Sequence, residues 1–189
     1  MGSVTAACIA FIGHDVVGLD FDQGTIEGLK NGKAPVFEPD LDDLIRQSID
    51  AGNLKFSTHS KEAVANAEVL WVAYDTPVDD DDHADVDYVI EQIESVMPYL
   101  ARGATVLVSS QMPVGSIRRL ETIAARNFSE RNLGFAYSPE NLRLGRALDV
   151  FLKPDRIIVG ARAERDKRRL DRLLTPITNC IEWMSVESA

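Results

Sequence analysis

The stretch MGSVTAACIAFIGHDVVGLDFD, residues 1–22, decides the predicted fold. Residues 2–12 are apolar enough to form a buried helix, and Gly13 is a helix-ending residue. Residues 15–20 predict an apolar strand that ends in an acid. A helix followed by such a strand is the second half of a nucleotide-binding βαβ unit, whose glycine loop and first strand would precede Met1. We therefore expect a nucleotide-binding fold with its first strand missing.

Helix and strand patterns alternate along the rest of the chain. The sequence predicts further helices over residues 22–31, 40–51, 60–67, 86–100, 116–127, 140–151 and 164–177. It predicts further strands over residues 54–58, 68–74, 104–110, 133–138, 155–161 and 180–185. Such alternation is typical of an α/β fold, here a doubly wound, Rossmann-like, mainly parallel sheet with helices on both faces. No linker interrupts the pattern, so we expect a single domain over residues 1–189.

Composition excludes several classes of partner. The chain has 30 acidic and 20 basic residues, a net charge of -10, which argues against nucleic-acid binding through the overall field. No apolar run approaches the length of a membrane span, so we expect no membrane partner. Cys8 and Cys180 form no disulfide framework or zinc spacing, which favours a cytoplasmic location and no metal. We expect both cysteines to be core residues.

Gly2 and Asp20 are the first candidate site residues. In a dinucleotide-binding fold, the acid that ends the second strand bonds the ribose hydroxyls about 20 residues after the glycine loop. Gly2 precedes Asp20 by 18 residues, which is the place of the last loop glycine. The alternative is that Asp20 is a simple strand-end acid and Gly2 has no special role. These residues alone leave both interpretations open.

Two segments place hydroxyl groups after predicted strands, at the sheet edge where open α/β folds bind ligands. Thr76 precedes Pro77 in the first segment, and Ser109, Ser110 and Gln111 lie in the second. Ordinary turn chemistry is the alternative explanation for both.

An acidic run follows the first of these segments, with aspartates at 79–82 and then His83. A calcium loop is excluded because Ala84 and Ile90 stand where that motif needs glycine and glutamate. We therefore favour solvated loop acids over a metal site, with Asp85 capping the next helix.

Glu140 follows Pro139 just beyond another predicted strand. It is a candidate general base or water-orienting group. It is equally placed to be a first-turn helix acid that the helix dipole favours, and taken alone that interpretation is preferred.

Together these segments resemble the UDP-glucose/GDP-mannose dehydrogenase family, specifically its N-terminal NAD-binding domain. The resemblance runs in order through GSVTAACIAFIGHDVVGLDFD, GKAPVFEPDLDDLI, DTPVDDDDHADVDYV, SSQMPVGS, SPENLRLGRALDVFLKPDRIIVG and SVESA. It implies oxidation of the C6 alcohol of a nucleotide sugar to a carboxylate, with two NAD molecules and a cysteine thioester, in polysaccharide biosynthesis. It also implies site roles: cofactor binding for Gly2, Asp20, Thr76 and Ser110, catalysis for Glu140 and Gln111, and substrate binding for Leu142 and Arg143.

Several residues depart from the family's motifs. Ser109 stands where the family has lysine, Gln111 where it has threonine, and Asp75 where it has glycine. Leu144 replaces a second glutamate, and Asn141 replaces a phenylalanine. These changes predict a diverged subgroup and leave the identity of the nucleotide sugar open. An acid at position 20 favours NAD over NADP, because it repels a 2′-phosphate.

The resemblance further implies that the family's central helix and its nucleophilic cysteine would follow Ala189, since neither Cys8 nor Cys180 matches that cysteine. We therefore expect this chain alone to be catalytically incompetent. Two hypotheses remain: the cofactor-binding portion of a nucleotide-sugar dehydrogenase, or a non-catalytic remnant that acts as a binding or oligomerisation module. Expected partners are NAD and the nucleotide sugar, and a homodimer stays open.

The missing strand has a structural consequence. In the strand order 3-2-1-4-5-6 the first strand is central, so its absence exposes two inner edges of the sheet. The flanking strands could close up, another chain could donate a strand, or further chain could precede Met1.

Overall fold

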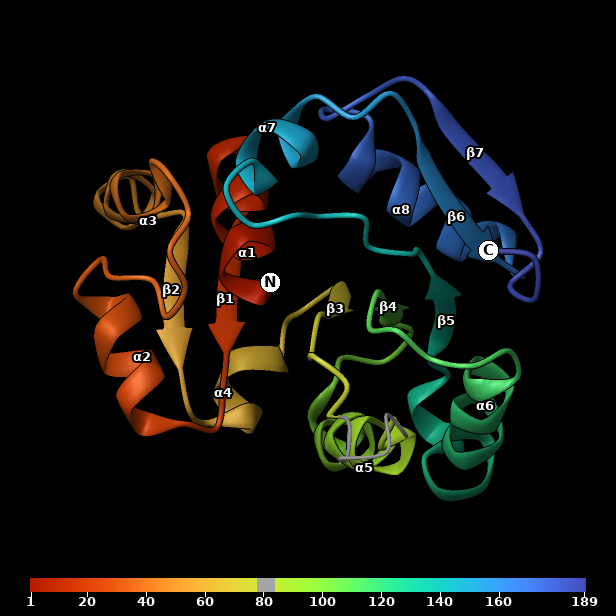
Figure 1. Ribbon diagram of the computed structural model, residues 1–189. Coiled ribbons are helices and arrows are strands. Elements are labelled where there is room, and N and C mark those ends of the chain that lie inside the picture. The colour runs from red at the N-terminus through yellow and green to blue at the C-terminus, as the bar shows by residue number, and fades with distance from the viewer. Residues whose placement is uncertain (78–83) are drawn as a thin grey trace.

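The computed structural model describes residues 1–77 and 84–189 (Figure 1). The acidic run at 79–82 and His83 lie outside the described residues. The helices are α1 (Gly2–Phe11), α2 (Gln23–Lys30), α3 (Leu41–Asp50), α4 (Ser60–Val64), α5 (Val86–Val96), α6 (Ser116–Asn127), α7 (Ala147–Leu152) and α8 (Glu164–Leu174). The strands are β1 (Val16–Leu19), β2 (Leu54–Ser57), β3 (Val69–Val72), β4 (Thr105–Val108), β5 (Gly134–Tyr137), β6 (Ile157–Ala161) and β7 (Ile181–Met184).

The described strands form two sheets. β1 and β2 pair in parallel, and the second sheet has the order β3-β4-β5-β6-β7. All neighbours in the second sheet are parallel except β5 and β6. Figure 1 shows β1 and β2 on one side of α1 and the five-stranded sheet on the other. The α/β, mainly parallel architecture predicted from the sequence is thus confirmed.

Helices cover both faces of the larger sheet because its strands alternate their side chains. Val106 and Val108 of β4 belong to an apolar cluster with α5 and α6. Leu107, between them, joins a second cluster with Leu170 and Leu174 of α8. Since successive strand residues point to opposite faces, β4 is buried on both sides.

β1 has one unpaired edge. The N–H groups of Val16 and Asp20 donate to carbonyl groups of Asn53 and Ser57, at 2.8 and 3.3 Å. A parallel ladder uses alternate residues of a strand, so the backbone groups of Val17 and Leu19 point away from β2. Val17 is 42% exposed, as expected for an edge residue.

β3 has a matching unpaired edge. Its Glu68 and Val72 carbonyls accept from Thr105 and Ser109 of the β4 segment, both at 2.9 Å. The same alternation turns the backbone groups of Trp71 away from β4. The strands that flank the expected missing strand have therefore not closed up on each other. Across the described residues, β1 and β3 share no sheet.

Two expectations about individual segments are wrong. The helix predicted over 140–151 begins only at Ala147, because Gly145 takes a φ of +92° that breaks a helix before that point. Glu140 is consequently not a first-turn helix acid. Cys180 is exposed and precedes β7, whereas Cys8 is buried as expected.

A buried acid secures α8 to the amino-terminal ends of β4 and β5. Asp166 is 2% exposed, and its carboxylate accepts a hydrogen bond of 2.7 Å from the Thr105 hydroxyl. A side chain on Gly134, the first residue of β5, would collide with that carboxylate. The charge pattern of α8 predicts a solvated helix face and gives no sign of this acid.

We expect Gly134→Ala to lower the free energy of unfolding by about 1–3 kcal/mol, because the new methyl group overpacks against a fixed carboxylate. Gly24→Ala is the matched control. Gly24 lies in α2, where a Cβ meets only the Asp22 carboxylate at 3.4 Å, so this change should stabilise by roughly 0.5–1 kcal/mol. Urea unfolding of both variants checks the opposite signs, and a neutral Gly134→Ala would contradict the packing described here.

Candidate functional site

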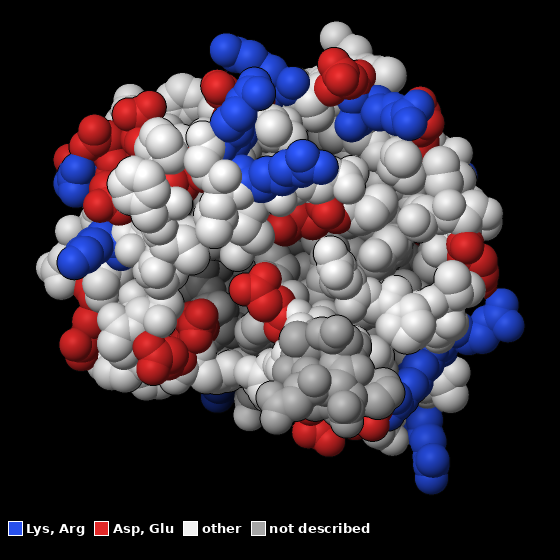
Figure 2. Space-filling view, viewed as in Figure 1, with Lys and Arg blue, Asp and Glu red and all other residues white. Residues whose placement is uncertain are grey.

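The carboxyl ends of β1, β3, β4 and β5 and the amino end of α1 form the candidate site. The β3, β4 and β5 strands are parallel, so the segments that follow them leave the sheet at one edge. A Cβ built on Gly2 would lie 3.8 Å from both the Cβ and the carbonyl oxygen of Ala73, just beyond β3. The first turn of α1 therefore adjoins this edge. The surface is hollowed beside the amino terminus, with acidic side chains at the rim (Figure 2).

Asp20 lies directly after β1. Its carboxylate accepts from the N–H of Asp22 at 2.9 Å, and Asp22 in turn caps α2 by accepting from Thr25 at 2.6 Å. Burial raises the pKa of Tyr74 to about 12, and the negative charge of Asp20 contributes to that shift. The ends of β1 and β3 thus lie within electrostatic reach of each other, although no hydrogen bond pairs their strands.

Thr76 and Gln111 join the segments that follow β3 and β4. The Thr76 hydroxyl donates to the carbonyl oxygen of Gln111 at 2.8 Å, and the Gln111 residue is exposed. Ser109 does not face the sheet edge as expected, because its hydroxyl accepts from the Trp71 indole N–H at 2.9 Å. That bond fixes Ser109 within the sheet.

Ser110 has a buried hydroxyl group without a hydrogen-bond partner in the described part of the chain. It is 3% exposed, and its hydroxyl has no hydrogen-bond partner among the described residues. Buried hydroxyl groups are nearly always bonded, because an unpaired one costs roughly 1–3 kcal/mol. The acid after β1 and the amino end of α1 are groups that fit a dinucleotide at this edge.

Glu140 lies just beyond β5 in a half-buried position. Burial raises the pKa of its carboxyl, the amino group of Met1 opposes that shift, and the charge of Asp75 adds to it. Glu140, Asp75 and the amino terminus therefore lie within electrostatic range of one another. A carboxyl with a raised pKa holds its proton to higher pH than an ordinary carboxyl does, which suits it to proton transfer.

The two expected substrate residues differ in their surroundings. Leu142 packs partly against the apolar cluster that contains α1 and α3, so much of its side chain is committed to the core. Arg143 is exposed and free to contact solvent or a ligand.

Two groups near the site were not found from the sequence. Glu38 is buried and bonds the N–H groups of Gly145 and Ala147. Asp75 is close enough to Glu140 to raise its pKa. No sequence signal pairs residues so far apart in the chain, although the Glu-Pro dipeptide at 38–39 marks a fixed turn.

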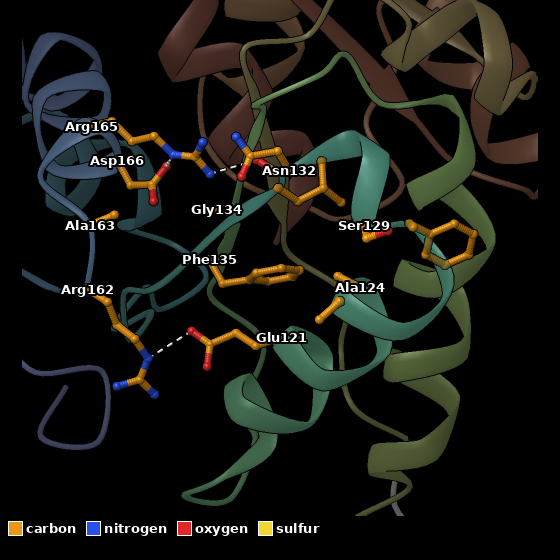
Figure 3. A pocket seen from close by; sticks show the side chains of 13 residues that line it. Glu121, Ala124, Ser129, Asn132, Gly134, Phe135, Arg162, Ala163, Arg165 and Asp166 are labelled. Atoms are coloured by element: carbon orange, nitrogen blue, oxygen red, sulfur yellow. Dashed lines mark hydrogen bonds and ion pairs between the residues drawn. The ribbon is translucent and has the colours of Figure 1, made fainter.

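The pocket shown in Figure 3 lies away from this edge. It has a volume of about 340 Å³ and is bordered by α6, the start of β5 and the start of α8. Arg162 donates there to Glu121 at 2.8 Å, and Arg165 donates to the Asn132 carbonyl at 2.7 Å. These charged groups are satisfied by the protein itself, so we assign no ligand to the pocket.

Metal-binding clusters and membrane-spanning helices are both absent from the described residues. Residues 1–77 and 84–189 contain no group of three or more His, Cys, Asp or Glu side chains arranged to hold a metal ion. None of the helices described here combines the length and apolar character needed to cross a bilayer.

A profile described as the UDP-glucose/GDP-mannose dehydrogenase family, NAD binding domain, matches residues 1–178. The chain belongs to this family. Its relatives include the UDP-glucose 6-dehydrogenases of Pseudomonas aeruginosa, 34% identical over 93% of this chain, and Rhizobium meliloti, 37% identical over 85%. The chain spans only 40% and 37% of the length of those two proteins.

Solved structures of the family have the same fold. A GDP-mannose dehydrogenase from Pseudomonas aeruginosa superimposes with a TM-score of 0.91 at 24% identity, covering 99% of this chain and 44% of its own. A UDP-glucose dehydrogenase from Pyrobaculum islandicum gives a TM-score of 0.90 at 31% identity, with 99% and 44% coverage. The resemblance to the family's NAD-binding domain, drawn from sequence motifs, is confirmed.

The raised pKa of Glu140 makes stability depend on pH. The folded state holds this proton more tightly than the unfolded state, whose carboxyl has the ordinary pKa of 4.5. The stability that this carboxyl contributes is therefore fully present below pH 4.5 and is lost as pH rises through the raised folded-state pKa. We expect Glu140→Gln to be more stable than the original chain at about pH 7, and the difference to shrink by about pH 4.

Thermal unfolding across this pH range checks the prediction, with Glu62→Gln, on the exposed surface of α4, as the control. A stability difference for Glu140→Gln that does not change with pH would show that the carboxyl titrates normally.

Proposed function

We propose that this chain is the NAD-binding portion of a nucleotide-sugar 6-dehydrogenase and binds NAD at the carboxyl edge of its strands. The observation that carries the proposal is that the amino end of α1 lies beside Ala73 just beyond β3, at the edge where Asp20, Thr76 and Ser110 follow their strands. Family membership supports NAD as the cofactor.

Each site residue has a proposed role. Asp20 accepts from the ribose hydroxyls. Gly2 lets α1 pack closely on the sheet, and the N–H groups at the start of α1 face the cofactor's pyrophosphate. Thr76 and Ser110 bond the cofactor farther along the edge. NAD, when bound, accepts hydride from the substrate alcohol.

The substrate roles lie in the segment after β5. Glu140 holds or relays a proton through water beside the C6 position, and Gln111 orients the reacting group. Arg143 and the backbone near Leu142 contact the nucleotide sugar. Which nucleotide sugar is bound stays open, since the chain spans about two fifths of the relatives' length.

The complete oxidation to a carboxylate belongs to a longer polypeptide in this proposal. The family's thioester step needs a reactive cysteine thiolate. Burial raises the pKa of Cys8 to about 12, so its thiol stays protonated and inert in the core. The sequence resemblance matches neither Cys8 nor Cys180 to the family's nucleophile, so we assign residues 1–189 to one domain that does not complete this oxidation alone. A cytoplasmic location and a role in polysaccharide biosynthesis accompany this assignment.

A second candidate function is a non-catalytic module for binding or oligomerisation. The unpaired edges of β1 and β3 favour it, because exposed edges are where other chains add strands. Cofactor titration separates the two candidates.

We expect Asp20→Ala to weaken NAD binding by roughly tenfold or more, since a bidentate carboxylate bond to the ribose is worth about 1.5–3 kcal/mol. Asp15→Ala is the matched control, because Asp15 is an exposed acid at the opposite end of the same strand. Calorimetric titration with NAD and NADP measures both variants. Equal losses in the two variants would exclude Asp20 from the cofactor site.

A strand fused ahead of Met1 should stabilise the protein and strengthen NAD binding. We expect about five apolar β-branched residues followed by a glycine-rich turn to pair with the free backbone groups of Val17, Leu19 and Trp71. A fusion of equal length with alternate prolines, which cannot donate to the ladder, is the control. If the fused strand raised stability without giving NAD binding, the second candidate function would be favoured.

A further inference from the structure

Glu38 joins two loops that are far apart in the sequence. It lies between α2 and α3, is 6% exposed, and accepts from the N–H groups of Gly145 at 2.5 Å and Ala147 at 2.7 Å. A longer contact of 3.4 Å comes from the N–H of Leu148. We propose that Glu38 is a positioning residue that holds segment 139–146 in place for the nucleotide sugar. This inference rests on the proposed function, which assigns Glu140 and Arg143 to the substrate.

The chemistry of the contact suits a carboxylate. Ala147 and Leu148 are the first residues of α7, so their N–H groups have no partner within the helix. An ionised carboxylate offers only acceptors, and the positive end of the helix dipole favours its charge. Among the described residues no Lys or Arg forms a salt bridge with Glu38 that would compete for it.

The loop that carries Glu38 is well anchored. Pro39 follows it with a fixed φ, and Asp40 takes a left-handed φ of 63° at the start of α3. Leu41 returns its N–H to the Glu38 carbonyl at 3.3 Å, and the N–H of Ala34 bonds the Asp42 carboxylate at 2.8 Å. Glu38 therefore projects from a constrained backbone.

Segment 139–146 has little to hold it besides Glu38. Within the described residues, its backbone N–H groups make one other hydrogen bond, from Arg146 to the Arg143 carbonyl at 3.2 Å. Leu144 is 56% exposed, and Leu142 supplies the apolar contact with the core. The Glu38 carboxylate thus accepts two charge-assisted hydrogen bonds that fix the carboxyl-terminal end of segment 139–146, which has few other contacts.

Glu140 lies between two attachments of the chain. Ser138, two residues before it, bonds the Val108 and Ile158 carbonyl groups, and Gly145, five residues after it, bonds Glu38. If the far end of the segment is released, Glu140 becomes better solvated, and the burial that raises its pKa is reduced.

Glu38→Gln tests the proposal in the full 189-residue chain. Glutamine keeps the size of the side chain but replaces one acceptor oxygen with an amide donor that faces N–H groups. We expect amide exchange at Gly145 and Ala147, and tryptic cleavage after Arg143 and Arg146, to accelerate about tenfold or more. The NMR titration of Glu140 should shift toward an ordinary carboxyl pKa.

Thr105→Val is the matched control. It removes the buried hydrogen bond to Asp166 at the amino-terminal ends of the strands, whereas segment 139–146 follows the carboxyl end of β5. We expect it to lower global stability while leaving exchange at Gly145 and the titration of Glu140 unchanged. Glu38→Asp, which keeps the charge on a shorter side chain, should give intermediate values and serves if Glu38→Gln does not fold.

Unchanged exchange at Gly145 and Ala147, together with an unchanged Glu140 titration, would overturn the proposal. An equal response to Thr105→Val would reduce Glu38 to a general stabilising role and would overturn it too. All of these measurements are made without NAD, so their outcome does not depend on whether the chain binds it.

Discussion

Side-chain packing joins the two sheets of this protein, because β1 and β3 belong to separate sheets in the described chain. Val4, Ala7 and Cys8 are fully buried in α1. Burying a valine side chain contributes roughly 1.5–3 kcal/mol, and burying the smaller alanine or cysteine side chain contributes less. The helix thereby stabilises the apolar cluster that it forms with β2 and α3. The helix touches β1, α3 and α7, while Leu19 of β1 packs against the cluster of the larger sheet. The position of β1 relative to β3 is therefore set by side chains rather than by a backbone ladder.

The candidate site depends on the same packing. The amino end of α1 meets the end of β3 at Ala73, and α7 packs on α1 while its own first N–H groups bind Glu38. The amino end of α1 and the substrate segment thus both pack against one apolar cluster, through Met1 and Leu142. A change that loosens α1 is expected to disturb both, whereas a change at Thr105, on the opposite edge, acts on stability alone.

Sequence patterns predicted the order and type of the regular elements because each has a local cause. Gly13 ends α1, Asp85 caps α5 by accepting from the Tyr88 N–H, and the apolar run of β4 is buried on both faces. These patterns did not predict features that depend on contacts between residues far apart in the sequence. The helix expected from residue 140 starts at Ala147, because Gly145 takes a left-handed φ and because a carboxylate more than 100 positions away accepts from the N–H of Ala147. Likewise, Trp71 takes the Ser109 hydroxyl away from the site, a contact that no spacing rule contains.

The departures from the family's motifs are also better understood in three dimensions. Leu144 replaces the second glutamate of the family's pair, and from the sequence alone that change removes a carboxylate neighbour from Glu140. Asp75, which replaces a glycine after β3, is nevertheless close enough for its charge to raise the pKa of Glu140. Glu140 thus has an acidic neighbour that comes from a different strand. The charge of Asp75 therefore acts in the same direction as burial on the pKa of Glu140, although the second glutamate of the family's motif is absent.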